Sequence, residues 1–172
     1  MKSVCYQLVF VALSTSVALS SAGCAGYQTG SQFLYRDDIR TVHVPVFESD
    51  SYRRFLGQRL TEAVIKQVEL DTPLTVTDPA IADSFIQGKL LRESKRNVTE
   101  DSFDEPRVLQ TDWRLEISWV DRAGVPLMAR QLLRINNGVE FIPEGGQSLS
   151  TAQQELINRI AREIVGQMET PW

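Results

Sequence analysis

Hydrophobic and polar positions alternate most regularly between Leu109 and Val120. Every second side chain there is large and apolar, in the order Trp113, Leu115, Ile117 and Trp119. A period of two is typical of a β-strand with one buried face and one face in water. Asp121–Gly124 then offers a short turn with a glycine available for positive φ, and Val125–Ile135 returns with apolar residues at alternate positions. The pattern predicts an antiparallel hairpin at the centre of the fold, with both tryptophans in the core.

A helical period begins further towards the N-terminus, at Tyr52, and continues to Leu70. Apolar side chains recur every three or four residues, and most of the remaining positions are charged. Glu48–Ser51 precedes this segment with several side chains that can cap a helix. Gly57 either weakens the first turns by about 1 kcal/mol relative to alanine or permits close packing. We therefore predict a helix over Tyr52–Leu70.

A second helical period lies near the C-terminus, over Thr151–Met168. Its apolar face is formed by Leu156, Ile157, Ile160, Ala161, Ile164, Val165 and Met168. Ser150, with Gln153 three residues later, matches a capping box, in which each side chain satisfies a free backbone N–H of the first turn. The sequence therefore predicts a terminal helix that begins directly after Ser150.

Three shorter segments predict further strands. Ile39–Phe47 has Val42, Val44 and Val46 at alternate positions, whereas Pro45 lacks a backbone donor and favours a sheet edge or a local irregularity. Leu74–Thr77 fits a short strand. Phe85–Arg92 fits a longer one, in which one face is shared by Ile86, Gly88 and Leu90.

Two polar segments are predicted to be loops: Ser94–Pro106, an exposed loop into which frayed strand ends can extend, and Asn136–Leu149. The first is rich in charge, and the second contains Asn-Asn-Gly and Pro-Glu-Gly-Gly. The order of elements leaves two amphipathic helices to cover the apolar face of one sheet. We therefore predict an α+β two-layer sandwich, with two helices on one face of a mixed, mainly antiparallel sheet of about four strands.

The N-terminus has a different pattern. Val4–Leu19 is apolar and uncharged, but it is shorter than the roughly 20 residues that cross a bilayer, and with Lys2 before it and small residues after it this is typical of a secretory signal. Leu19–Cys24 ends in Ala-Gly-Cys and resembles the lipobox of bacterial lipoproteins, in which the cysteine is acylated and the chain is cut before it. Ser21 stands where that motif usually has leucine. The alternative is an ordinary signal peptide, which leaves Cys24 as a free thiol.

Cleavage before Cys24 divides the chain into a signal peptide over 1–23, a lipidated N-terminus and spacer over 24–38, and a single domain over 39–172. The mature chain has 172 − 23 = 149 residues, which suits one domain. Since the signal contains one lysine and no acid, 17 basic residues face 22 acidic ones, and this net charge of −5 argues against a nucleic-acid partner. Cys5 leaves with the signal, so the domain has no thiol for a disulfide or a metal. Several acyl chains would tether it firmly to a membrane.

No catalytic constellation is visible in the sequence. His43 is the single histidine, so neither a histidine metal cluster nor a nucleophile–histidine pair can be built, and we interpret it as a structural residue. Gly145-Gly146 precedes a helix but lacks the lysine of a phosphate-binding loop. We therefore predict no enzyme activity, no metal and no cofactor.

A group of cations is the best candidate for a binding site. Arg114 lies on the polar face of the hairpin, and Arg130 and Arg134 share a face of the returning strand, while Lys89 can extend the group. Several cations on a sheet face can bind the phosphates of a lipid head group through charge-assisted hydrogen bonds. The alternative is an ordinary solvated face, in which Asp112 and the neighbouring Glu116 balance the arginines.

Several of these features together resemble the lipopolysaccharide-assembly lipoprotein family, LptE. They are the Gly23-Cys24 end of the signal, Gly26-Tyr27, the valine-rich strand with its helix, Gly88-Lys89 in a strand, the long hairpin and the terminal helix. The resemblance implies an outer-membrane lipoprotein whose domain faces the periplasm or lies in the lumen of the large β-barrel LptD. It further implies that the protein plugs this barrel, assists its assembly and contributes to delivery of lipopolysaccharide, which Lys89, Arg114, Arg130 and Arg134 would contact.

A second function remains open from the sequence. The strand at Val42–Phe47 and the helix after it also resemble the start of small periplasmic lipoproteins that activate cell-wall synthases or form curli-type secretion complexes. A regulator of that kind would use an exposed patch on a free domain. A barrel plug would be enclosed by its partner and should co-purify with it.

Overall fold

The fold is seen in a computed structural model that describes residues 35–100, 106–128 and 133–169, all within the compact unit Ser31–Trp172. Its strands are β1 (Thr41–His43), β2 (Glu48–Ser49), β3 (Thr75–Val76), β4 (Ser84–Glu100), β5 (Pro106–Asp121) and β6 (Leu133–Phe141). Its helices are α2 (Leu56–Asp71), the 3-10 turn η3 (Pro143–Gly145) and α3 (Leu149–Gly166). None of the helices in these ranges is long and apolar enough to cross a bilayer.

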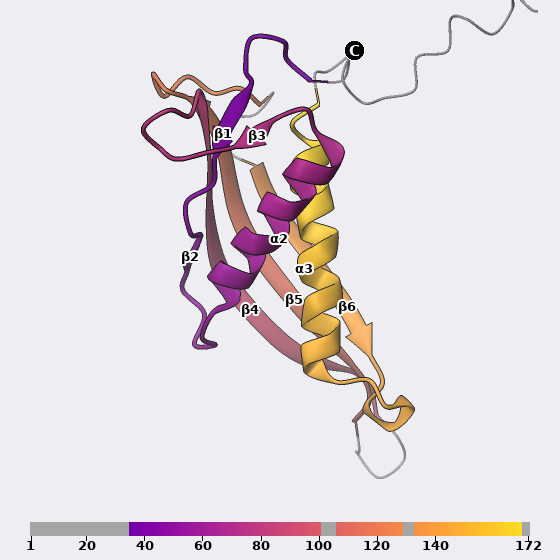
Figure 1. The fold of residues 1–172 in the computed structure, drawn as a ribbon. Coiled ribbons are helices and arrows are strands. Elements are labelled where there is room, and N and C mark those ends of the chain that lie inside the picture. The colour runs from indigo at the N-terminus through magenta and orange to yellow at the C-terminus, as the bar shows by residue number, and fades with distance from the viewer. Residues whose placement is uncertain (1–34, 101–105, 129–132, 170–172) are drawn as a thin grey trace, which may run out of the picture. The chain divides into compact units, whose positions relative to one another are not determined.

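The six strands form one mixed sheet in the order β3-β1-β4-β5-β6, with β2 also paired to β4. The helices α2 and α3 lie side by side on one face of this sheet (Figure 1). The predicted α+β two-layer arrangement is therefore confirmed, although the sheet has six strands where about four were expected.

The core lies between β5 and the two helices. The four alternate apolar side chains of β5 are at most 1% exposed, as the period of two predicts: Trp113, Leu115, Ile117 and Trp119. The helices bury the faces that their sequence pattern defines, and α3 contributes its Ile and Leu side chains together with Met168. Apolar area removed from water in this way stabilises a fold by about 25 cal/mol per Å².

The hairpin that follows β5 differs from the prediction. The turn at Asp121–Gly124 is confirmed, with Gly124 at φ 83°, but the regular partner strand is β6, which begins at Leu133 rather than Val125. Residues 136–141, predicted as part of a loop, are therefore strand. The reason is that Val139 and Phe141 continue the buried face of Ile135, and that Gly138 gives room where an added Cβ would overlap Asp112.

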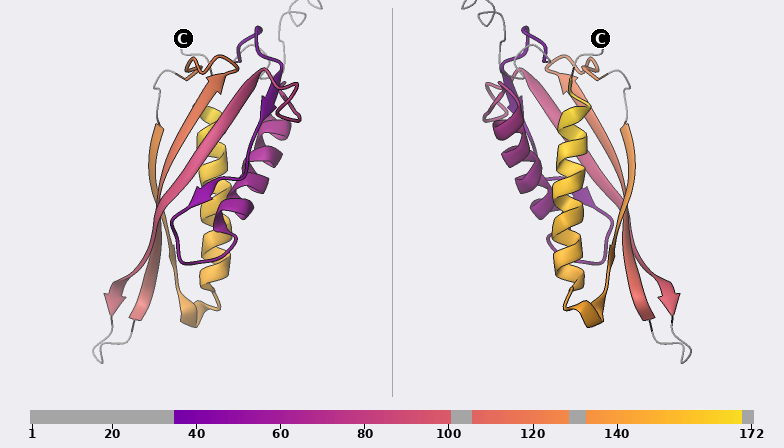
Figure 2. Two further views of the ribbon diagram at one scale, coloured as in Figure 1. Left: turned by 90° about the vertical axis from the view of Figure 1, so that its left-hand side faces the viewer. Right: turned by 90° about the vertical axis from the view of Figure 1, so that its right-hand side faces the viewer.

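The prediction of a loop over Ser94–Pro106 is also wrong for much of its length. β4 continues to Glu100 and β5 already begins at Pro106, and the two strands stay paired, with Arg96 opposite Gln110 and Lys95 opposite Thr111. This β4–β5 ribbon, residues 94–100 and 106–112, projects away from the helices (Figure 2). Cross-strand pairing holds it, so it needs few apolar groups.

The first predicted strand is interrupted at Pro45. β1 ends at His43 and lies between β3 and β4, so it is internal rather than at an edge, and pairing with β4 resumes at Glu48. Between these two residues the chain advances five positions while its partners on β4 advance four. The extra residue shifts the alternation, so Val46, predicted to share a face with Val42, is 68% exposed.

The same shift turns Phe47 into the core, where it packs against Gly88 and Gly57. A Cβ on Gly88 would come within 2.8 Å of the Phe47 ring and of the Ile117 Cδ1 atom. A Cβ on Gly57 would overlap the Phe47 carbonyl oxygen, and the Phe47 backbone N–H donates to Thr61 Oγ1 at 2.9 Å. Gly57 therefore serves close packing, one of the two alternatives that the sequence left open.

Both helices begin elsewhere than predicted. α2 starts at Leu56 rather than Tyr52, after Phe55 in a left-handed conformation, and no side chain caps it. α3 starts at Leu149, and its cap is Ser148, whose hydroxyl accepts from the Thr151 N–H at 3.1 Å. The predicted capping box of Ser150 and Gln153 is thus wrong, because the Gln153 side chain is buried and committed to another contact, described below.

Tyr35 packs against the core near the ends of the two helices. Its side chain is buried in the core cluster, and burial raises the pKa of its phenol, which Glu169 and Asp71 raise further. Asp71 is the last residue of α2, and Glu169 follows the end of α3. Tyr35 therefore lies at the C-terminal ends of both helices.

Candidate functional site

The outer face of the sheet, opposite the helices, contains a groove of about 840 Å³ across β4, β5 and β6. We call it the arginine groove, because four arginines line it: Arg92, Arg96, Arg114 and Arg134. It also has polar and acidic walls, among them Asp112, Glu116 and Asn136. The chemistry of the groove therefore depends on which of the cations are neutralised.

An irregularity in β4 directs one of these arginines outward. Leu90 pairs with Leu115 and Arg92 pairs with Arg114, so Leu91 is an extra residue on β4. A bulge of this kind changes which face the following side chains take. Arg92 consequently lines the groove beside Leu91, and Glu93 turns to the helix side.

The bulge places two like charges side by side. Arg92 stands directly opposite Arg114 in the register of β4 and β5. Like charges in such a pair disfavour folding, because the two cations repel each other. Arg114 Nε donates to Asn136 Oδ1 at 3.0 Å, and Arg92 makes no ion pair or side-chain hydrogen bond within the described ranges. No carboxylate in that part of the chain neutralises this pair, which is suited to bind an anion.

Other cations of the outer face are balanced. Arg134 Nε lies 3.1 Å from Glu116 Oε1, and Arg96 Nε lies 3.3 Å from Asp112 Oδ2. The ordinary solvated face therefore describes these two arginines but not the pair at Arg92 and its neighbour Arg114.

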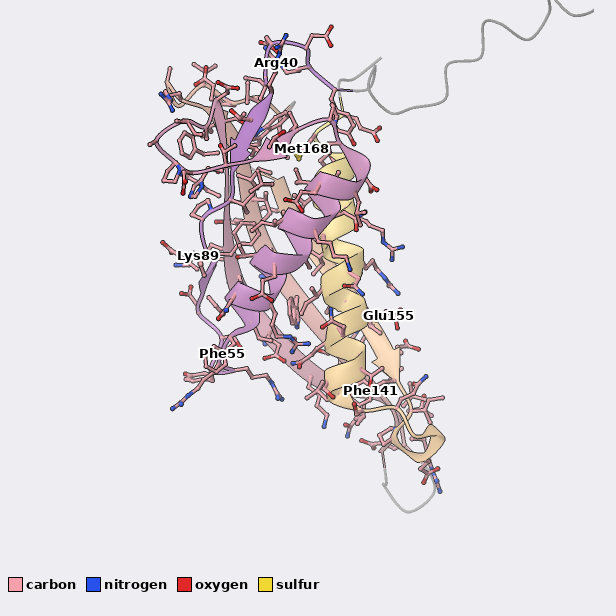
Figure 3. All side chains as sticks on the ribbon, viewed as in Figure 1. Arg40, Phe55, Lys89, Phe141, Glu155 and Met168 are labelled. Carbon is pink, nitrogen blue, oxygen red and sulfur yellow. The ribbon has the colours of Figure 1, made fainter. Side chains whose placement is uncertain are left out.

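Lys89 is held apart from the arginine groove. Its ammonium lies 3.2 Å from Asp50 Oδ2 and 3.7 Å from Glu48 Oε2, at the β2 side of the sheet (Figure 3). The hydrogen bond to Asp50 holds the pKa of Lys89 above its usual value. Of the four predicted candidates, the structure brings Arg114 and Arg134 together, it separates Lys89, and Arg130 lies outside the described residues.

Sequence reasoning missed two of the groove arginines. Arg96 lies in a segment that was predicted to be a loop, and Arg92 becomes its neighbour in the groove only because of the bulge. Residues 92–96 are polar without a period of two, so they gave no signal for the longer strand. Nothing in the sequence marks the bulge.

His43 has a structural environment. Its Nδ1 lies 2.8 Å from the Thr77 carbonyl oxygen, and its ring meets the edge of Phe85 at a centroid distance of 6.0 Å. Over the residues that the structure describes, no group of three or more His, Cys, Asp or Glu side chains could hold a metal ion. The proposed acylation site, Cys24, lies outside those residues.

Several solved structures are similar to this chain. Hypothetical protein CT253 from Chlamydia trachomatis matches with a TM-score of 0.51 and 10% identity, over 74% of this chain and 94% of that one. Lipoprotein B from Nitrosomonas europaea matches with a TM-score of 0.49 and 14% identity, over 81% and 90%. Rare lipoprotein B from Shewanella oneidensis matches with a TM-score of 0.43 and 13% identity, over 75% and 93%. No curated protein matches the sequence.

The family model described as "LptE: Lipopolysaccharide-assembly" matches residues 39–170, which is most of the chain. The match includes every described strand and helix, the groove among them. The family consists of non-enzymatic lipoproteins, and its role lies in lipopolysaccharide assembly. The chain belongs to the LptE lipopolysaccharide-assembly family.

Proposed function

We propose that this lipoprotein plugs the lipopolysaccharide-translocating β-barrel of the outer membrane, LptD-like in type, and assists its assembly. Membership in the lipopolysaccharide-assembly family supports the proposal. A plug must present polar surface on several sides, because the interiors of such barrels are polar. The wet outer face of the sheet and the β4–β5 ribbon both meet this requirement.

Within this role, the arginine groove would bind lipopolysaccharide phosphates. One observation carries this part of the proposal: Arg92 and Arg114 lie directly opposite each other, and no described carboxylate neutralises them. Guanidinium groups donate parallel hydrogen bonds to phosphate oxygens, and a bound phosphate would remove the repulsion between the two cations. Arg134 lines the same groove and Arg130 is a further candidate, whereas Lys89, held by Asp50 and Glu48 outside the groove, would contact lipopolysaccharide only separately from it.

Binding of purified lipopolysaccharide to the full-length protein tests this site. Arg114→Glu should weaken binding about tenfold or more, because it replaces a phosphate donor by a repelling charge. Arg162→Glu is the matched control, since Arg162 is exposed on the helix side. Equal binding by wild type and both variants would refute the assignment.

Photo-crosslinking in intact cells tests the plug. Crosslinkers at Val98, on the ribbon, and at Gly145, in η3, should capture a large β-barrel protein. Gly138 is unsuitable because a side chain there would overlap Asp112. Depletion of the lipoprotein should also lower the amount of folded barrel. Capture of a cell-wall synthase, with barrel levels unchanged on depletion, would instead establish the regulator function.

The anchor has its own test. We propose that Cys24 is acylated and holds the domain at the outer membrane. Cys24→Ala should abolish incorporation of labelled fatty acid and release the protein from membranes, whereas unchanged labelling would contradict the assignment. Sucrose-gradient fractionation of the wild type reports which membrane holds it.

A further inference from the structure

The backbone at the two edges of the sheet has different surroundings. At the β6 edge, α3 covers the backbone: Arg159 Nη1 donates to the Gly138 carbonyl oxygen at 3.2 Å, and Asn137 Nδ2 donates to Glu163 Oε2 at 3.2 Å. At the other edge, β2 accompanies β4 only as far as Leu90, whose carbonyl oxygen accepts from the Asp50 N–H at 2.9 Å. Beyond Leu90, no described strand pairs with β4 on this side.

Side-chain contacts hold residues 51–53 away from this open edge. After Asp50 the chain leaves the line of β2, and two of its side chains contact Glu93, which α3 also contacts through Gln153 and whose side chain is only 7% exposed. Ser51 Oγ donates to Glu93 Oε2 at 3.0 Å, while Glu93 Oε1 lies 2.9 Å from Arg53 Nε and 2.6 Å from Gln153 Nε2. This clamp keeps residues 51–53 on the helix side, so no described strand continues β2 beside β4.

The turn before α2 is strained in support of this arrangement. Phe55 has a φ of 66°, which is rare for a bulky side chain, and it is exposed at the start of α2 (Figure 3). Backbone strain of this kind persists where the surrounding contacts impose it, and it clusters at functional sites.

A hollow of about 520 Å³ lies beside the open edge. The turn contributes the fully exposed Tyr52, and β4 contributes Leu91, Arg92 and Lys95. Lys95 makes no ion pair within the described ranges, whereas the two acids of the hollow are already engaged, Asp50 by Lys89 and Glu93 by the clamp. Among the residues that the structure describes, the hollow therefore has an unpaired backbone edge, the aromatic side chain of Tyr52 and cations without a neutralising carboxylate.

We propose that the β4 edge, residues 91–100, docks an extended acidic segment of a partner protein by strand addition. Main-chain hydrogen bonds to the free edge would supply affinity, as in other cases where a peptide extends a sheet. Charge complementarity to Lys95 and Arg92 selects acidic side chains, and Tyr52 offers apolar contact to an alternate residue. This inference concerns a partner surface that adjoins the lipopolysaccharide groove and shares Arg92 with it, whereas Lys95 lines the edge hollow and not the groove.

Cations on an edge strand also have a simpler use, which is to prevent uncontrolled pairing. The two explanations differ in a measurable way. If Lys95 only prevents pairing, an acidic peptide should not bind the edge, and Lys95→Glu should prevent pairing equally well because it also places a charge there. If it selects a partner, the same variant reverses the preference.

The test uses the full-length protein and a synthetic seven-residue peptide, acetyl-Thr-Glu-Val-Asp-Val-Glu-Thr-amide. The control is the same peptide with lysine at each of the three acidic positions. Hydrogen exchange read by mass spectrometry should slow over residues 92–100 with the acidic peptide and not over residues 133–141. The lysine peptide should have no effect. Absence of protection, or equal protection by both peptides, would overturn the proposal.

Variants separate this surface from the proposed groove. Lys95→Glu should weaken the acidic peptide at least tenfold and favour the lysine peptide, while leaving lipopolysaccharide binding unchanged. Lys66→Glu, an exposed lysine on α2, is the matched control and should change neither. Arg114→Glu should reduce only lipopolysaccharide binding. Protection over 92–100 that rises with protein concentration, without peptide, would assign the edge to a second copy of the chain and refute an acidic partner.

Discussion

The two faces of β5 stand in opposite surroundings although they belong to one backbone. On the inner face, Trp113 and Trp119 are buried under the helices, and the contacts there stabilise the fold. On the outer face, Arg114 lies opposite a second arginine, an arrangement that disfavours folding. Side chains two residues apart lie on the same face of the strand, and adjacent side chains lie on opposite faces. The comparison teaches that stability and binding can be altered separately along the same strand.

The largest expected effect is on the inner face. Trp119→Ala should lower the free energy of unfolding by about 3–5 kcal/mol, because it removes a buried ring and leaves a cavity. Against a total of about 5–15 kcal/mol, this leaves a substantial unfolded fraction. Arg114→Ala is the control and should be nearly neutral. Denaturant melts of the two variants compare the faces directly, and equal losses would mean that the assignment of faces is wrong.

A smaller effect is expected at Gly88, which lies against the Phe47 ring and Ile117. Gly88→Ala should destabilise the fold by about 1–3 kcal/mol, because the added methyl group meets the Phe47 ring and Ile117. Gly166→Ala adds the same methyl group in open space at the end of α3, so it should be neutral or stabilising. Thermal melts of the pair report the difference. A neutral Gly88→Ala would show that Phe47 does not depend on this close approach.

The smallest effect has the opposite sign. Arg92→Glu converts the like-charge pair with Arg114 into an opposite-charge pair, so the fold should gain about 0.2–1 kcal/mol. The gain should shrink at high salt, because both groups are solvated. A denaturant melt at two salt concentrations detects it. Loss of stability would mean that the two cations do not repel each other in the free protein.

The buried half of the fold could be predicted because a period is a local signal. The alternation in β5 and the helical spacing in α3 each define one apolar face, and burial follows from it. In the β4–β5 ribbon, residues 95–100 of β4 have no such signal, since all of them are exposed and pairing with β5 decides their structure. Asn136-Asn137-Gly138 has the composition of a turn, yet neighbouring β5 holds it in a strand.

The binding face was predicted only in part, for a different reason. The position of Arg114 follows from the same alternation that buries Trp113. Arg92 depends on one extra residue in β4, and the position of Lys89 depends on acids that β2 brings from elsewhere in the chain. Bulges and long-range ion pairs arise from tertiary packing, which a single stretch of sequence does not encode.

The buried Tyr35 limits the length of the tether between the acylated cysteine and the core. With Cys24 acylated, as proposed, 35 − 24 = 11 residues separate the anchor from the point where the chain joins the core, and a fully extended chain of that length spans about 36–40 Å. β4, with 17 residues, is about 56 Å long. This tether is shorter than the longest strand, so it limits how far from the acylated cysteine the core at Tyr35 can lie.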